Sequence, residues 1–188
     1  MTFDQSLATS NKWKAEIRWA LKSVISGYSN NSYSDMNLLF REMFSDSRIA
    51  QNFAMSKDKI RYMINYGLAP HFKSTLHIVI KSSECFVVSF DESLNSITQE
   101  CQLDVVIRFF NKNQGKVESH YWDSQFIGHS TADDILEHFC KSLEKLNNSK
   151  LRQVSMDGPS INWKFLDLLS KLSVDPEFSN LVNIGSCS

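Results

Sequence analysis

The chain has 188 residues, of which 42% are hydrophobic and 22% are charged, and its formal net charge is −1. This is the balance of a globular chain that can build a hydrophobic core. No stretch approaches the ~20 continuous apolar residues that span a bilayer, and the N-terminus lacks the basic and apolar regions of a secretory signal. We therefore expect a nuclear or cytoplasmic protein that is neither secreted nor membrane-spanning, and nothing indicates a small-molecule substrate.

The cysteines and histidines form no metal-binding or disulfide pattern. The four cysteines are far apart without a CxxC pair, and the five histidines form no HxxxH or HExxH motif. A zinc finger or a disulfide framework requires closer spacing. We expect reduced thiols in core positions, because free cysteine is commonly buried. The cysteines are Cys85, Cys101, Cys140 and Cys187.

Charge is distributed unevenly along the chain. Residues 1–83 hold 11 Lys and Arg against 6 Asp and Glu, whereas residues 84–188 hold 9 against 15. A basic first part is compatible with a DNA partner. An excess of this size is also typical of the solvated surface of ordinary helices, so both interpretations stay open.

The first 83 residues have the period of amphipathic helices. One apolar stripe runs from Trp13 to Ile25, and a second occupies residues 36–43. Ser56 is the predicted cap of a further helix that ends at Gly67, and Pro70 begins the last helical segment. The pattern predicts an all-helical region over residues 1–83.

From residue 84 onward the pattern changes to that of strands. A continuous apolar run, an alternating segment and a third segment after a polar turn predict a meander of three strands. A capped helix, a short strand, a second helix and a final strand follow. In chain order, the strands are expected at residues 85–90, 102–110, 116–128, 151–156 and 181–188, with the two helices beginning after Thr131 (or Ser130) and Pro159.

The order β-β-β-α-β-α-β predicts an α/β fold, a mixed sheet with helices on both faces. It is the order of an RNase H-like fold, which normally continues into another helix. We therefore expect a partial, C-terminally truncated RNase H-like domain over residues 84–188. In this topology the first and fourth strands lie side by side and parallel at the centre of the sheet.

Two acids follow these central strands. Asp91 and Asp157 are predicted at the C-terminal ends of the first and fourth strands, and parallel neighbours are ~4.8 Å apart. Their carboxylates would repel one another unless a cation such as Mg²⁺ or Mn²⁺ bound between them. The alternative is that each is an ordinary strand-end Asp that satisfies local N–H groups.

No third acid joins the pair convincingly. Glu92 is adjacent to Asp91 in the chain and is therefore expected on the opposite face of its strand. Asp104, within the second strand, is more typical of a polar position on a partly exposed face. Glu177 precedes the last strand rather than following it on a helix.

The segments that contain these acids resemble the hAT superfamily of DNA transposases (hobo/Activator type). The resemblance runs from about residue 15 onward. Its most specific parts are "YWDSQFIGHSTADDIL" at residues 121–136 and the pairing of "VVSFDES" with "VSMDGPSINWKF" at residues 87–93 and 154–165.

The resemblance implies an RNase H-like catalytic core with a DDE triad and divalent metal ions. It matches Asp91 to the first acid and Asp157 to the second. The third acid of the family, a Glu after a large helical insertion, has no counterpart in these residues, nor do the BED-type zinc finger and the dimerisation region. We therefore expect a transposase-derived chain that is catalytically silent on its own.

Two other functions stay open. The chain could be a domesticated module that binds DNA or, through an exposed sheet face, a protein partner, without catalysis. It could also be a nuclease of another type that uses Asp91, Asp104 and Asp157.

Overall fold

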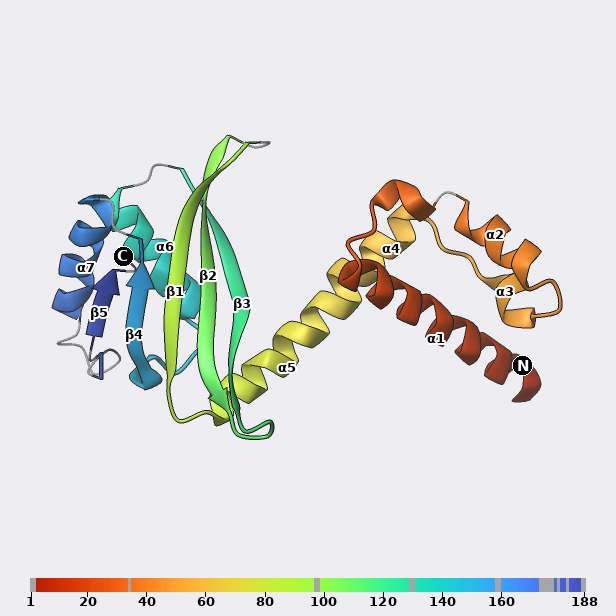
Figure 1. Ribbon diagram of the computed structural model, residues 1–188, viewed down its shortest axis with the longest axis horizontal. Coiled ribbons are helices and arrows are strands. Elements are labelled where there is room, and N and C mark those ends of the chain that lie inside the picture. The colour runs from red at the N-terminus through yellow and green to blue at the C-terminus, as the bar shows by residue number, and fades with distance from the viewer. Residues whose placement is uncertain are drawn as a thin grey trace. The chain divides into compact units, whose positions relative to one another are not determined.

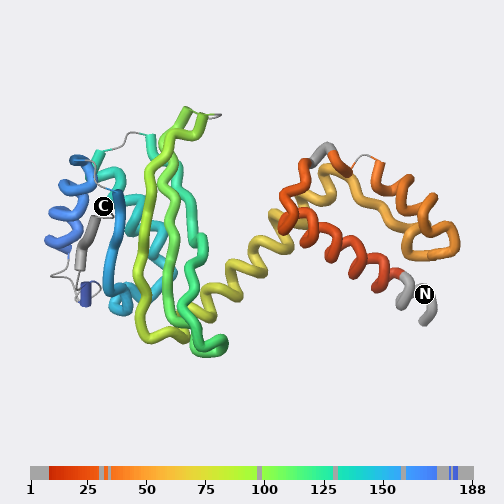
Figure 2. The backbone as a smooth tube through the Cα atoms, viewed as in Figure 1, coloured from red at the N-terminus to blue at the C-terminus, as the bar shows by residue number. Residues whose placement is uncertain are grey.

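The computed structural model describes residues 3–33, 35–96, 99–128, 131–157, 160–172, 178, 180–181 and 183–186 (Figures 1 and 2). By their internal contacts the residues divide into two compact units, Met1–Ser74 and Thr75–Ser188. Each unit has its own hydrophobic core. In the part of the chain that the structure describes, no helix is long and apolar enough to cross a membrane.

The first unit is helical, as predicted. Its core is small and is formed by Ala20, Tyr33, Met36, Phe53, Met55 and Ile60. Its helices are α1 (Phe3–Ile25), the 3₁₀ turn η1 (Asn30–Tyr33), α2 (Met36–Met43), α3 (Arg48–Asn52), α4 (Lys57–Met63), the π-helical turn η2 (Ile64–Leu68) and the start of α5 (Ala69–Ser82).

Helix α1 buries a different face from its most apolar one. Trp13 and Ile25 of the predicted stripe are 49% and 73% exposed, whereas Ala20 of the stripe and Glu16 outside it are fully buried. The Glu16 carboxylate lies 2.7 Å from the ammonium of Lys59 and accepts a hydrogen bond from the backbone N–H of Ala54. A buried charge with such partners is tolerated, and those partners lie too far along the chain for the local pattern to reveal them.

The predicted end of a helix at Gly67 is wrong. Helix α4 continues through η2 into α5, and the N–H of Ala69 bonds to the carbonyl of Ile64, five residues back. Pro70 explains the wider turn, because proline has no N–H and its ring clashes with the carbonyl four residues earlier in a regular α-helix. The helical turn takes in one more residue, and the helix continues instead of ending. The predicted cap of α4 is confirmed, since the Ser56 hydroxyl accepts from the N–H of Lys59.

The second unit contains a mixed five-stranded sheet with the order β3-β2-β1-β4-β5 (Figure 1). β1 and β2 pair antiparallel, as do β2 and β3, whereas β4 is parallel to both β1 and β5. The predicted element order and the parallel pairing of the first and fourth strands are confirmed. The elements are β1 (Phe86–Asn95), β2 (Glu100–Asn111), β3 (Lys116–Ile127), α6 (Ala132–Leu143), the 3₁₀ turn η3 (Asn148–Lys150), β4 (Leu151–Met156), α7 (Ser160–Leu172) and β5 (Asn183–Ser186).

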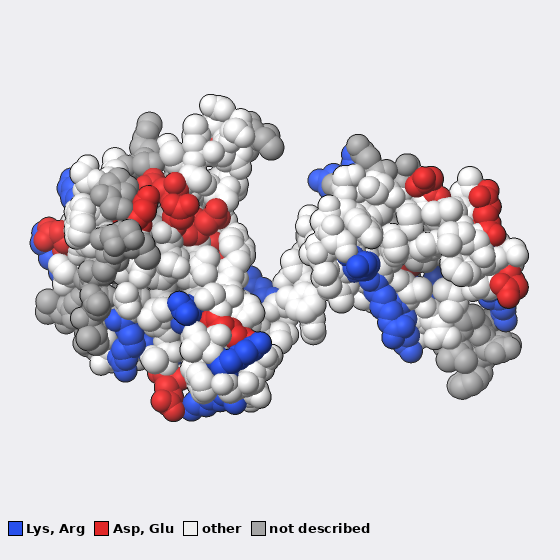
Figure 3. Space-filling view, viewed as in Figure 1, with Lys and Arg blue, Asp and Glu red and all other residues white. Residues whose placement is uncertain are grey.

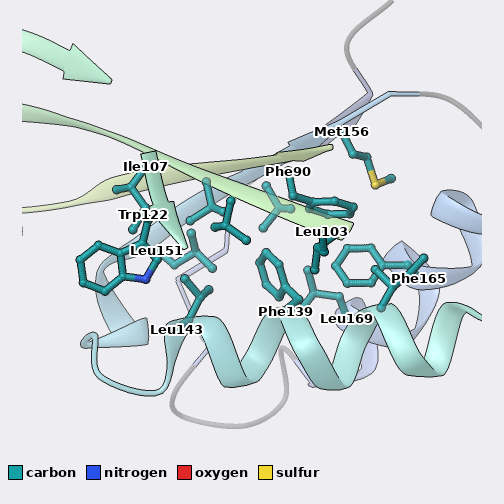
Figure 4. Close-up of a cluster of buried hydrophobic side chains, with 14 of the residues drawn as sticks. Phe90, Leu103, Ile107, Trp122, Phe139, Leu143, Leu151, Met156, Phe165 and Leu169 are labelled. Atoms are coloured by element: carbon teal, nitrogen blue, oxygen red, sulfur yellow. The ribbon is translucent and has the colours of Figure 1, made fainter. Parts of the chain in front are cut away.

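Helices α6 and α7 cover the same face of the sheet, so the prediction of helices on both faces is wrong for the described residues. Phe90 of β1 packs against Phe139 of α6 and Phe165 of α7, at ring-centroid distances of 5.7 and 5.0 Å (Figure 4). The crossovers β3-α6-β4 and β4-α7-β5 join parallel strands and advance in the same direction along the sheet. Right-handed crossovers in one direction place their helices on one face.

The opposite face, which we call the open face, is formed by side chains that alternate with the buried ones. Ser89, Asp91, Arg108 and Phe110 on this face are exposed, while Val88 and Phe109 beside them in the chain are buried. No described helix packs on the open face.

The two units divide between Ser74 and Thr75, within α5 and before the predicted boundary after residue 83. The second half of α5 belongs to the sheet unit, since Ile80 is buried in its core. The Lys150 ammonium also donates to the carbonyls of Lys81 and Ser83, both at 2.8 Å.

The expectation of reduced thiols in core positions is met in part. Cys85 is exposed, whereas Cys101 and Cys140 are half-buried and pack against the core of the sheet unit, and none of the three is in a disulfide. Cys187 lies outside the described residues.

Candidate metal centre

Asp91 lies inside β1 rather than at its end, so its predicted position at the end of a strand is wrong. β1 continues to Asn95 because residues 92–95 pair with residues 100–103 of β2 in a long hairpin. The pairing of β1 with β4, however, ends at Ser89. Asp91 is therefore just beyond the point where the two central strands are held together.

Asp157 directly follows β4, as predicted. Ser89 of β1 is level with Ser155 of β4, and each Asp is two residues further along its strand in the same direction. Both acids are exposed. The register thus brings them to one rim of the sheet, where the parallel pair of strands ends.

The carboxylate of Asp157 is held by the first turns of α7. Asn162 donates from Nδ2 to Oδ1 of Asp157 at 2.9 Å, and the same nitrogen is 3.4 Å from the backbone carbonyl of Asp157. Asn162 is only 1% exposed. The contact anchors one oxygen of an otherwise exposed carboxylate to the covered side of the sheet.

A third acid lies beside Asp91. Asp104 of β2 is directly opposite Asp91 in the antiparallel register, and its Oδ1 accepts hydrogen bonds from Gln102 Nε2 and Ser124 Oγ, both at 2.8 Å. Acidic side chains gather over β1 and β2 on the visible face of the sheet unit (Figure 3). From the sequence, Asp104 is expected as an ordinary polar position, and as a site residue only in the alternative of another type of nuclease.

The register of the hairpin fixes this neighbour. Because Asn95 faces Glu100 in the antiparallel pair, residue 91 must face residue 104. Glu92 pairs with the buried Leu103 and so lies on the helix-covered face, away from Asp91, as expected. Glu177 is outside the described residues.

The two rim acids have the chemistry of a magnesium ligand set. Mg²⁺ binds through one or two carboxylates and completes its shell with waters and phosphate oxygens, so the exposed oxygens of Asp91 and Asp157 fit it. Among the residues that the structure describes, no group of three His, Cys, Asp or Glu side chains could hold a metal ion. A divalent ion here would therefore have at most two carboxylate ligands from the described residues, with waters in its other positions.

No protein-family model matches the chain, and no curated protein matches it significantly.

Proposed function

We propose that the sheet unit is the first part of the RNase H-like core of a hAT-type transposase, with Asp91 and Asp157 as the first two acids of its DDE triad. The observation that supports this most is the order β3-β2-β1-β4-β5, with one acid on β1 and one directly after β4, each two residues beyond the point where their parallel pairing ends. The sequence resemblance implies the same roles for the same two residues.

The proposed site residues have distinct tasks. Asp91 is exposed on the open face and would offer its carboxylate to Mg²⁺ or Mn²⁺ together with Asp157. Asp104, opposite Asp91, adds a negative charge that favours a cation. A bound divalent ion would neutralise these acids and supply the positive charge that phosphodiester transfer requires.

We propose that residues 1–188 on their own bind the ion without cleaving DNA. Two carboxylates can hold a divalent ion, but the third acid that the resemblance implies has no counterpart in this stretch. Residues 1–188 would then supply two of the three acids of the site.

Titration with Mn²⁺, followed by the loss of the free-ion electron paramagnetic resonance signal, tests the proposal. We expect the unchanged chain to bind Mn²⁺, and Asp91→Asn and Asp157→Asn each to weaken binding at least tenfold. Asp167→Asn is the matched control, because Asp167 is an exposed acid paired with Lys171 on α7. Absence of binding, or equal binding by all variants, would contradict the proposed site.

A cleavage assay tests the proposal that residues 1–188 do not cleave DNA. Terminal-repeat DNA incubated with the chain and Mg²⁺ or Mn²⁺ should stay intact. Strand cleavage that disappears in Asp91→Asn would show that residues 1–188 form an active enzyme and would overturn this part of the proposal.

A second candidate function, a binding module without catalysis, is favoured by the apolar side chains on the open face. Phe110 and Val117 face each other in the β2–β3 register and Tyr121 faces Val106, and Phe110, Val117 and Tyr121 are at least half exposed. A salt-dependent DNA mobility shift that survives Asp91→Ala and Asp157→Ala would favour the DNA-binding form of this function.

A further inference from the structure

We infer that Asn162 is a positioning residue that orients the carboxylate of Asp157 for a divalent ion. The inference rests on the proposed function, since it takes Asp157 as a metal ligand. Asn162 would act through Asp157 rather than bind the ion itself. Two features of its side-chain amide support this role: the direction of its hydrogen bond and its buried oxygen.

The first fact is the direction of the Asn162 side chain. Its amide nitrogen donates to Oδ1 of Asp157 at 2.9 Å, and it is also 3.4 Å from the backbone carbonyl of Asp157. A donor to one carboxylate oxygen fixes the side-chain torsion and leaves the other oxygen for a cation. Ligating carboxylates in metal sites are held by such outer hydrogen bonds.

The second fact concerns the amide oxygen of Asn162. Among the described residues, Oδ1 of Asn162 has no hydrogen-bond partner although it is buried, and the whole residue is 1% exposed. A buried, unpaired carbonyl oxygen destabilises a fold. The neighbouring α7 residues Phe165 and Leu166 are buried and apolar. An apolar side chain would therefore suit this buried position better than an asparagine does.

These facts distinguish positioning from a purely structural role. If Asn162 only held Asp157 against α7 for stability, its removal would lower the free energy of unfolding of the unit. It would then change metal binding only through unfolding. If it positions Asp157, its removal should weaken metal binding while stability stays the same or rises.

Asn162→Leu in the full 188-residue chain separates these cases, because leucine branches at the same carbon as asparagine and has no donor. We expect the Mn²⁺ dissociation constant, measured by paramagnetic resonance, to rise roughly 10- to 100-fold. The urea midpoint, measured by circular dichroism without metal, should stay unchanged or increase. Asn162→Ala should give the same loss of affinity and serves if the leucine does not fit.

Asn148→Leu is the matched control. Oδ1 of Asn148 is also buried and unpaired, but Asn148 lies in η3, before β4, whereas Asp157 follows β4. Its replacement should leave Mn²⁺ affinity unchanged.

The outcomes separate this inference from the proposed function. If the unchanged chain binds no Mn²⁺, the proposed function fails and the inference fails with it. If Asp157→Asn loses binding while Asn162→Leu and Asn162→Ala keep full affinity, only the inference is overturned. A loss of affinity that occurs only together with loss of folded protein in both variants would also overturn it.

Discussion

The three acids of the candidate centre have different surroundings although all carry the same carboxylate. Asp157 is anchored by Asn162, and Asp104 by Gln102 and Ser124, whereas Asp91 is exposed on the open face. Like charges directly opposite in an antiparallel pair destabilise it, and Asp91 faces Asp104 in this way. The unit therefore carries an electrostatic cost at the place where a cation would relieve it.

Asp104→Asn should raise the free energy of unfolding of the sheet unit by about 0.2–1 kcal/mol. The substitution removes one charge and keeps the Oδ1 acceptor used by Gln102 and Ser124. The gain should shrink at high salt, which screens charges at a partly exposed site. Urea denaturation at low and high salt measures both effects.

Glu100→Gln is the control for this prediction, since Glu100 is an acid of the same strand that faces the neutral Asn95. It should leave stability unchanged. A loss of stability in Asp104→Asn would mean that the charge of Asp104 is held favourably by its hydrogen bonds and that repulsion by Asp91 is negligible.

The helical elements of the first unit contain two glycines in opposite roles. Gly27 ends α1 at a φ of +62°, with its N–H bonded to Val24 and the N–H of Tyr28 bonded to Ser23. These are the hydrogen bonds of a left-handed helix end, for which glycine is favoured. Gly67, in contrast, is inside η2, outside the left-handed region, and an added Cβ would meet nothing within 4 Å.

Gly67→Ala should therefore stabilise the helical unit by about 0.4–1 kcal/mol, because alanine lowers the entropy of the unfolded chain and fits the native backbone. Gly27→Ala should destabilise the same unit by about 1–2 kcal/mol, because its Cβ is strained at a positive φ. Thermal denaturation followed by circular dichroism compares the two variants. Destabilisation by Gly67→Ala would indicate that the helix does end at Gly67, as the sequence pattern predicts.

At the scale of the whole molecule, the chain holds two separate cores, and α5 contributes to the second of them. Ile80 is 1% exposed and packs with the sheet residues, and Lys150 ties the end of α5 to the start of β4 through Lys81 and Ser83. Residues 75–83, which the sequence pattern assigns to the helical region, are thus part of the sheet unit.

A fragment of residues 75–188 should consequently be more stable than one of residues 84–188. The shorter fragment lacks Ile80, whose loss from a core costs about 2–5 kcal/mol, and the two carbonyl groups that Lys150 binds. Urea midpoints of the two fragments test this, with Ile80→Ala in the longer fragment as a point control. Equal urea midpoints would mean that the folded sheet unit begins after residue 83.

Part of the candidate centre could be predicted from the sequence. The resemblance and the strand order already single out Asp91 and Asp157, and the parallel pairing of their strands is confirmed; their binding of a metal stays a prediction. Asn162 was not predicted as part of the centre, and Asp104 was predicted there only in the alternative of another type of nuclease. Asp104 depends on the register of a hairpin longer than its apolar core suggests, and Asn162 depends on where α7 begins relative to β4.

The sequence by itself determined the order of elements, the helical nature of the first unit and the cap at Ser56, because periodicity and capping act over a few residues. Only the tertiary structure decided which face of α1 is buried, that the helix passes Gly67 and that α6 and α7 share one face of the sheet. The physical reason is the same for α1 and the sheet: Glu16 needs Lys59, and helix placement needs the direction of both crossovers. Such requirements join residues that are distant in the chain, and local patterns do not contain them.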